Sequence, residues 1–162
     1  MPLMQIDWVV IFTFTVAWYF QPFQRVDIFN RYDETVGWIP GAPPRWLFGP
    51  AWAVIYALLS AATFIFWRDG VAADQYTSTM TLILINWVLN KIWFITYSLS
   101  NLASFFIIVA TLGTAISVVV SFAVVGIWSS FVMWLIYVLW LVYASYLNGA
   151  QVFMKRTMIP AM

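Results

Sequence analysis

The side chains in this chain that could do chemistry are aromatic rings, two amides and one amine, because its 162 residues include no cysteine and no histidine. Thiolate nucleophiles, soft metal ligands, the commonest general base and the commonest imidazole ligand are therefore missing. We expect no metal site, no required cofactor and no ordinary acid–base, nucleophilic or metal catalysis. Binding of a ligand by aromatic and amide side chains is the chemistry that this composition favours.

Tryptophan occurs 11 times. Tryptophan is common at both membrane interfaces because its ring is amphipathic. We assign three that lie at the ends of apolar stretches to such anchoring: Trp8, Trp67 and Trp128. Trp140 differs, because it lies near the middle of an apolar stretch with Tyr137 and Ala144 at helical spacing. No headgroup is within its reach, so it must pack in a core or contact a ligand.

The segment from Pro43 to Trp52 holds three prolines, one glycine and two tryptophans. Pro44 can begin a helix, because the N–H of a first-turn residue has no partner within the helix. Pro50 must kink or restart that helix. We predict a shaped aromatic cleft at this helix entrance, where Trp46 and Trp52 are either interface anchors or ligand contacts.

Asn86, Asn90 and Lys91 are strongly polar residues within an otherwise apolar stretch. Asn86 and Asn90 share one helical face, and an unsatisfied amide in hydrocarbon is costly, so both should face other helices. They either bond helix to helix or offer a polar handle to a ligand. Lys91 is a functional candidate by its position, but its long stem allows the amine to snorkel to the interface, which we favour.

The elements that position these residues are membrane-spanning helices. From Ile92 to Met154 the chain runs 63 residues without a charged residue or histidine, enough for at least two spans of about 20 residues. We predict an all-α integral membrane bundle of five transmembrane helices in one domain, residues 1–162. The expected spans are 6–23, 45–68, 78–97, 102–125 and 129–154, and residues 24–44 form a loop that caps the ligand site.

Basic residues are unevenly shared between the two faces that five spans define. The face with the first loop, the third loop and the C-terminal tail carries all but one of the basic residues outside the spans: Arg25, Arg31, Arg45, Lys155 and Arg156. Arg68 alone lies on the other face. The positive-inside rule therefore puts the first loop and the C-terminus in the cytosol. The net charge of +1 gives no reason to expect nucleic acid as a partner.

Small residues recur at every fourth position along two of the predicted helices. The two stripes are Ala53, Ala57 and Ala61 on the second helix, and Gly113, Ser117 and Ser121 on the fourth. In lipid, small residues let helices approach closely. We favour contacts within one bundle, and a homodimer face is the alternative.

Several segments, in chain order, resemble the TspO/MBR family, whose members are also called tryptophan-rich sensory proteins, translocator proteins and peripheral-type benzodiazepine receptors. The matching residues are the second-helix segment 43–61, the pair Asn86-Trp87, and on the fifth helix Tyr137, Trp140 and Leu147-Asn148. The resemblance covers roughly residues 38–153. After the Asn-Trp pair, the residues Val88-Leu89-Asn90-Lys91 depart from the proline-containing pattern usual in the family.

This resemblance implies a membrane receptor or translocator that binds porphyrin, haem or a similar flat, apolar ligand, and that transports it or supports its light-dependent breakdown. The implied ligand-binding residues are Trp38, Trp46, Phe48, Trp52, Tyr56, Asn86, Trp87, Tyr137, Trp140 and Ala144. Trp52 and Trp140 would be the photochemical pair. A planar macrocycle also gains from stacking on aromatic rings, which favours the same ligand class.

Two functions of other classes are alternatives. A small-solute transporter or channel would have Asn86, Asn90 and Lys91 along its path, with Lys91 facing an aqueous cavity. A regulatory protein would dock partner membrane proteins. The expected surroundings are membrane lipid in each case, in the cell membrane of a bacterium or the outer mitochondrial membrane of a eukaryote.

Overall fold

The computed structural model describes residues 13, 15–18 and 36–154, and within these ranges it contains no β-strand. A 3-10 turn, η1 (Arg45–Leu47), precedes four long helices: α4 (Phe48–Asp69), α5 (Tyr76–Leu99), α6 (Asn101–Val125) and α7 (Trp128–Phe153). All four helices are long and apolar enough to cross a membrane. The protein is therefore an all-α integral membrane protein, as the sequence predicts.

The first predicted span, 6–23, lies largely outside the described residues. Thr13 and residues 15–18 are helical, and the remainder of that span, together with residues 24–35 of the predicted loop, is not described. The described turn of helix contacts both α4 and α5, because Trp18 stacks on Tyr56 and the Trp87 indole donates to the carbonyl of Ala17. These contacts place the described turn between α4 and α5.

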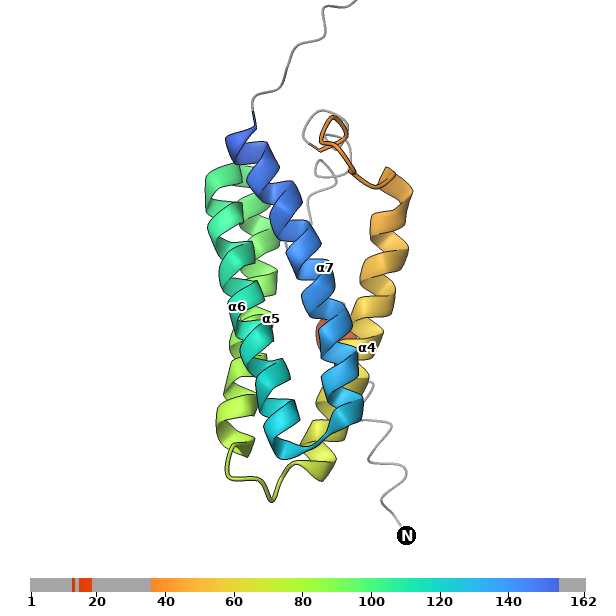
Figure 1. Ribbon diagram of the computed structural model, residues 1–162, viewed down its shortest axis with the longest axis vertical. Helices are drawn as coiled ribbons and strands as arrows, with labels where there is room; N and C mark the ends of the chain where they lie inside the picture. The colour runs from red at the N-terminus through yellow and green to blue at the C-terminus, as the bar shows by residue number, and fades with distance from the viewer. Residues whose placement is uncertain (1–12, 14, 19–35, 155–162) are drawn as a thin grey trace, which may run out of the picture.

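The four described helices run alternately up and down the bundle (Figure 1). Residues 36–44, the α5–α6 junction and the end of α7 lie at one end, and the α4–α5 and α6–α7 turns lie at the other. We call these the loop end and the turn end. The predicted sharing of one face by the first loop, the third loop and the C-terminal helix end is confirmed for these residues.

The helix boundaries follow the breakers in the sequence. Ser100 ends α5 and caps α6, because its Oγ accepts from the N–H of Ala103 at 3.3 Å. Gly126 ends α6 in a left-handed conformation with φ of 82°, and the N–H groups of Gly126 and Ile127 both reach the carbonyl of Phe122. Pro50 lies in the first turn of α4, so the α-helix restarts after η1 instead of kinking.

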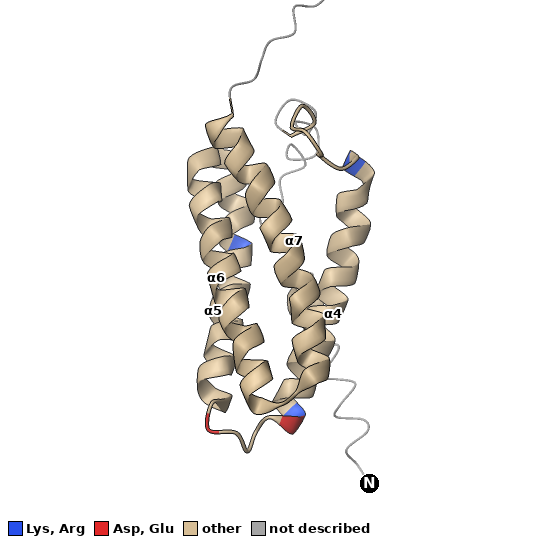
Figure 2. Ribbon diagram, viewed as in Figure 1, with Lys and Arg blue, Asp and Glu red and all other residues tan. Residues whose placement is uncertain are grey.

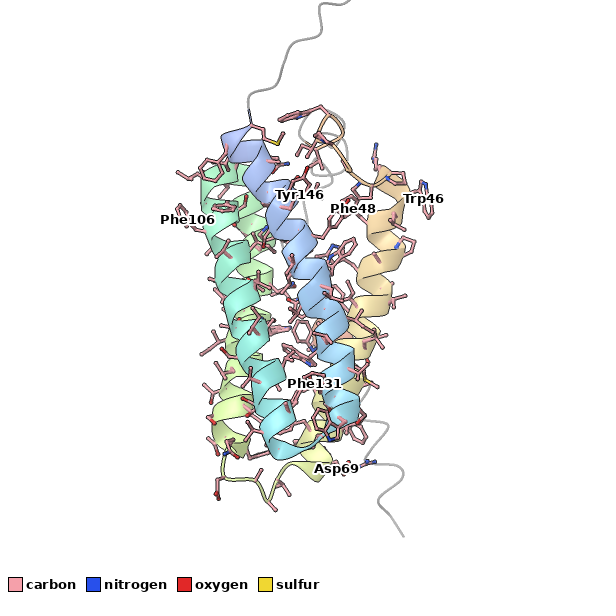
Figure 3. All side chains as sticks on the ribbon, viewed as in Figure 1. Trp46, Phe48, Asp69, Phe106, Phe131 and Tyr146 are labelled. Atoms are coloured by element: carbon pink, nitrogen blue, oxygen red, sulfur yellow. The ribbon has the colours of Figure 1, made fainter. Side chains whose placement is uncertain are left out.

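Apolar side chains cover the outer surface along the helices, as a bilayer requires. Phe106 (Figure 3), Val120 and Leu139 are examples with more than half of their surface exposed. Among the described residues, charged groups lie at the helix ends or in the turns, with the exception of Lys91 within α5 (Figure 2). Within the described helices, the one charge away from a helix end therefore lies against the bundle.

The stripe of small residues on α6 points outward. Gly113 and Ser117 are exposed, and a methyl group added to Gly113 would meet no atom within 4 Å. On α4, Ala57 is exposed and its neighbours Ala53 and Ala61 are half-buried. The interpretation of the α6 stripe as a contact within one bundle is therefore wrong, because its face is turned toward lipid.

Candidate functional site

A narrow cavity lies between α4, α5 and α7 at the loop end of the bundle. The residues that line it are Val36, Phe48, Trp52, Trp93, Phe94, Tyr97, Trp140, Ala144, Leu147, Asn148 and Gln151. None of these side chains is charged. The cavity is therefore apolar and aromatic with a few neutral polar groups, which is the usual composition of a site for a largely apolar small molecule.

Trp52 lies at the centre of the aromatic lining. Its ring centroid is 6.0 Å from that of Trp140 at an interplanar angle of 82°, 6.3 Å from Trp93 and 6.0 Å from Phe94. Phe48 packs edge-on against Trp140 at 5.9 Å. Three helices thus each contribute at least one indole to the same cluster, and α4 supplies the one that touches the other two.

Of the indole N–H groups of Trp93 and Trp140 at the cavity, one is hydrogen-bonded within the described part of the chain and the other is not. The Trp93 indole donates to Oδ1 of Asn148 at 3.3 Å, and the Ser104 hydroxyl donates to the same oxygen at 3.1 Å. Asn148 therefore fixes the orientation of the Trp93 ring. The indole nitrogen of Trp140, in contrast, is buried and has no hydrogen-bond partner among the described residues. It is a donor available to a ligand.

The loop between η1 and the undescribed segment covers this end of the bundle. The hydroxyls of Tyr143 and Tyr146 donate to the carbonyls of Gly41 at 2.7 Å and Pro40 at 2.8 Å. Beside these bonds, four apolar residues form a buried cluster that joins the loop to α7: Val36, Ile39, Leu147 and Ala150. Residues 36–44 are therefore fixed to α7 above the cavity.

A buried polar network lies deeper in the bundle. The Tyr56 hydroxyl donates to Asn90 at 3.0 Å, and the Tyr137 hydroxyl donates to Oδ1 of Asn86 at 3.2 Å. The Asn86 amide donates to the carbonyl of Thr111 at 2.8 Å. Both asparagines are fully buried. The network joins all four described long helices, which confirms the interpretation of Asn86 and Asn90 as bonds between helices.

Lys91 does not snorkel to the interface, and that expectation is wrong. Its Nζ donates to the carbonyl of Trp18 at 2.6 Å and lies 5.2 Å from the ring centre of Tyr56 and 5.7 Å from that of Trp87. A carbonyl and two aromatic faces thus stabilise the ammonium within the bundle. Lys91 secures the first helix against α5.

The structure gathers only part of the predicted ligand set. Phe48, Trp52, Trp140 and Ala144 line the cavity, and Tyr56 lies beneath Trp52 at 5.2 Å. The other predicted residues lie elsewhere. Asn86 and Tyr137 belong to the buried network, Trp87 faces the first helix, Trp38 packs against the cluster under the loop, and Trp46 is 70% exposed (Figure 3).

The residues of α5 that line the cavity differ from those predicted for this helix, Asn86 and Trp87. Trp93, Phe94 and Tyr97 were not among its candidates, although all three line the cavity. Helical spacing carries the missing signal, because Trp93 and Tyr97 lie three and seven residues after Asn90 and so share its face. Asn148 was noted only as part of a motif, and its contact with Trp93 depends on the packing of α5 against α7.

The cavity is smaller than the cleft that the sequence suggests. Its volume is about 70 Å³, whereas pockets for drug-sized ligands occupy roughly 300–1,000 Å³. The aromatic side chains largely fill the space between α4, α5 and α7. A planar ligand would enter this cluster only if indoles turned or helices separated.

A larger hollow of about 680 Å³ lies between α4 and α5 toward the turn end. Its lining includes Thr63, Trp67, Tyr76 and Trp87 together with Trp18 of the first helix. Ala17 and Trp18, from the described part of the first helix, border this hollow, and no predicted ligand-binding residue other than Trp87 lines it among the described residues.

The comparisons with known proteins agree with this architecture. The sequence model of the TspO/MBR family matches residues 8–154 of the chain. A stretch of 33 residues is 46% identical to the tryptophan-rich protein TspO of the archaeon Archaeoglobus fulgidus. That stretch covers 20% of this chain and 22% of the relative, so the pairwise match spans about a fifth of the relative's length.

Proposed function

Because the chain belongs to the TspO/MBR family, we propose that it is a membrane receptor for a flat, largely apolar ligand, with tetrapyrroles as the leading class. The observation that carries this proposal is the cluster of Trp52, Trp93 and Trp140, contributed by three helices around one cavity. Indole faces stack on extended π-systems, and such contacts contribute beyond the area that they bury. In this proposal the ligand stacks between the indoles of Trp52, Trp93 and Trp140.

The polar groups of the site support a ligand with an acceptor atom near its edge. The buried N–H of Trp140 has no partner in the described part of the chain and can donate to a carbonyl or ring nitrogen. None of the described residues that line the cavity is basic, so the carboxylates of a porphyrin stay outside it, near the loop end. The apolar macrocycle lies inside and its charged groups remain solvated.

A titration tests this proposal. Protoporphyrin IX is added to the full chain in lipid nanodiscs while tryptophan emission is followed, and we expect saturable quenching that weakens in Trp52→Phe and Trp140→Phe. Trp128→Phe is the matched control, because Trp128 is 61% exposed at the turn end. Absence of saturable quenching, or equal quenching in all three variants, would defeat the assigned site.

Light-dependent breakdown of a bound porphyrin is the finer part of the proposal and would start at Trp52 and Trp140. Their centroids lie 6.0 Å apart, so both rings contact a ligand in the cavity. Illumination of the porphyrin-loaded protein should bleach the porphyrin bands, and the bleaching should slow in either Phe variant. Bleaching at the rate of free porphyrin in empty nanodiscs would remove this part and leave the binding proposal intact.

Transport of a small solute is less well supported. Asn86 and Asn90 are engaged in bonds between helices, and Lys91 bonds a carbonyl of the first helix. These residues therefore hold the bundle together where a transport path would need them free to contact solute. Liposome flux that disappears in Lys91→Met, with the fold retained, would favour the transport alternative.

A further inference from the structure

The Trp140 side chain separates the inner cavity from a second hollow on the lipid-facing surface. This outer groove, of about 620 Å³, runs between α4 and α7 and is lined by Leu47, Pro50, Ala51, Val54, Ile55, Ile136, Leu139, Trp140 and Tyr143. Of the described residues, Trp140 alone lines both the groove and the cavity. We propose that the ligand of the proposed function enters sideways from the acyl chains of the bilayer, between α4 and α7, and that the Trp140 indole is the gate.

The chemistry of the groove fits an approach through lipid. Its lining carries no charged residue, and Val54, Ile136 and Leu139 are 59%, 44% and 63% exposed. In a membrane-spanning helix such side chains face acyl chains. Figure 1 shows α4 and α7 close together toward the turn end and diverging toward the loop end. The widest part of their gap therefore lies at the level of the cavity.

The route from water at the loop end is obstructed more heavily. To open it, residues 36–44 would lose the hydrogen bonds from Tyr143 and Tyr146 and expose the buried side chains of Val36 and Ile39. The lateral route requires one indole to turn. Because the Trp140 N–H makes no hydrogen bond with the described residues, this turn breaks none of its own. Among the described residues, the Trp140 ring is held by aromatic contacts and not by a hydrogen bond, so it is the weaker barrier.

The experiment measures how fast a membrane-resident probe reaches the site. Protoporphyrin IX dimethyl ester, dissolved in the lipid of nanodiscs, is followed by stopped-flow quenching of tryptophan emission. Ala51→Trp fills the groove without changing any cavity-lining residue, so association should slow by roughly tenfold. Ala110→Trp is the matched control, because Ala110 is an exposed alanine on α6, a helix that contributes no residue to the groove lining. Its association rate should equal that of the unchanged chain.

A third variant distinguishes the two routes. Tyr146→Phe removes one bond that holds the loop to α7 and lies outside both hollows, so lateral entry predicts an unchanged association rate. Faster association in Tyr146→Phe together with an unchanged rate in Ala51→Trp would overturn the proposal in favour of entry at the loop end. Absence of quenching in the unchanged chain would instead refute the proposed function itself.

A measurement of lipid contact decides the question even where Ala51→Trp does not fold. Lipids brominated on their acyl chains quench indoles that they touch, and a gate that faces the groove must be among these. We expect the quenched fraction of emission to fall in Trp140→Phe by more than in Trp93→Phe, because Trp93 lines only the inner cavity. Equal losses would place Trp140 away from lipid and exclude it as the gate.

Discussion

Asn148 lines the cavity and also positions the Trp93 ring. Its Oδ1 accepts from the Trp93 indole at 3.3 Å and from Ser104 at 3.1 Å, while its own amide donates to the carbonyl of Ala144 at 2.8 Å. The side chain is fully engaged inside α7 and between α7 and two neighbours. It therefore positions an aromatic wall of the cavity in the way that buried amides fix helix contacts in membranes.

We predict that Asn148→Leu weakens protoporphyrin IX binding by about fivefold to tenfold, because the Trp93 indole loses its acceptor and turns away from the cluster. Titration by tryptophan quenching in nanodiscs measures this. Ser104→Ala is the control, since it removes the second donor and leaves the bond to Trp93 in place. Equal affinity in Asn148→Leu and Ser104→Ala would contradict a positioning role.

Asn86, in contrast to Asn148, stabilises the helix bundle and does not line the cavity. It donates to Thr111 and Thr114 on α6 and accepts from Tyr137 on α7. Asn86→Leu should lower the free energy of unfolding by about 1–3 kcal/mol, since it leaves buried polar partners unsatisfied. Thermal unfolding in detergent measures the loss. Ser117→Leu, a change on the lipid-facing side of α6, should have little effect, and an equal loss there would refute the assignment.

Residue roles were only partly predictable from the sequence. The hydrogen-bonding role of Asn86 and Asn90 was predictable, because an amide in hydrocarbon has few other uses. The choice of lining residues was harder. Trp46 and Trp52 lie in one segment, yet Trp46 is 70% exposed and Trp52 is half-buried at the centre of the cluster. Which face of α4 looks inward depends on where the helix restarts after η1.

The helix boundaries, at the next scale, follow local chemistry closely. The predicted spans 102–125 and 129–154 differ from α6 and α7 by one residue at most. The serines, asparagine and glycine that separate the helices make caps and a left-handed turn. The outward face of the small-residue stripe on α6 was not predictable in this way, because a stripe alone does not say which neighbour it meets.

Replacement of two glycines by alanine, one in the turn after α6 and one within α6, should change the stability of the protein in opposite directions. Gly126 has φ of 82°, where a side chain is strained, so Gly126→Ala should destabilise the protein by about 1 kcal/mol. Gly113 lies within α6 with open space around it, so Gly113→Ala should stabilise by up to about 1 kcal/mol through helix propensity. The two midpoints of thermal unfolding should move in opposite directions. A rise of both midpoints would contradict the strain at Gly126, and a fall of both would contradict the open space at Gly113.

At the scale of the whole molecule, α4 and α7 pack closely in the half toward the turn end, which we call the tight half. They pack less closely in the half toward the loop end, which we call the loose half. Toward the turn end, α7 packs against α4 through Ser130, whose hydroxyl donates to the carbonyl of Ala62 at 2.9 Å, and the fully buried ring of Trp134 lies in the core. Toward the loop end, α4 and α7 diverge (Figure 1), and the rings of Phe48 and Trp140 pack edge-on between them. Sequence patterns identified the helices, but this difference in packing depends on side chains from distant segments and was not predictable.

The small cavity volume, together with this difference in packing, predicts that ligand binding moves helices apart at the loop end. A cavity of about 70 Å³ cannot hold a macrocycle. Separation of α4 from α7 requires the least free energy in the loose half, where the two helices already diverge (Figure 1). Insertion of one planar ring between indoles adds about 3.5 Å, the contact distance of carbon atoms. Binding of protoporphyrin IX should therefore move α4 away from α7 at the loop end by roughly that distance and leave the turn end unchanged.

Spin labels on engineered cysteines measure this movement, and the chain has no native cysteine to interfere. The test pair is Val54→Cys on α4 with Leu139→Cys on α7, both exposed on the groove. The control pair is Val120→Cys on α6 with Val132→Cys on α7, both exposed near the turn end. Protoporphyrin IX should lengthen the first distance and not the second. If neither distance changes while quenching saturates, the ligand binds without parting these helices, because the indoles make room by rotation alone.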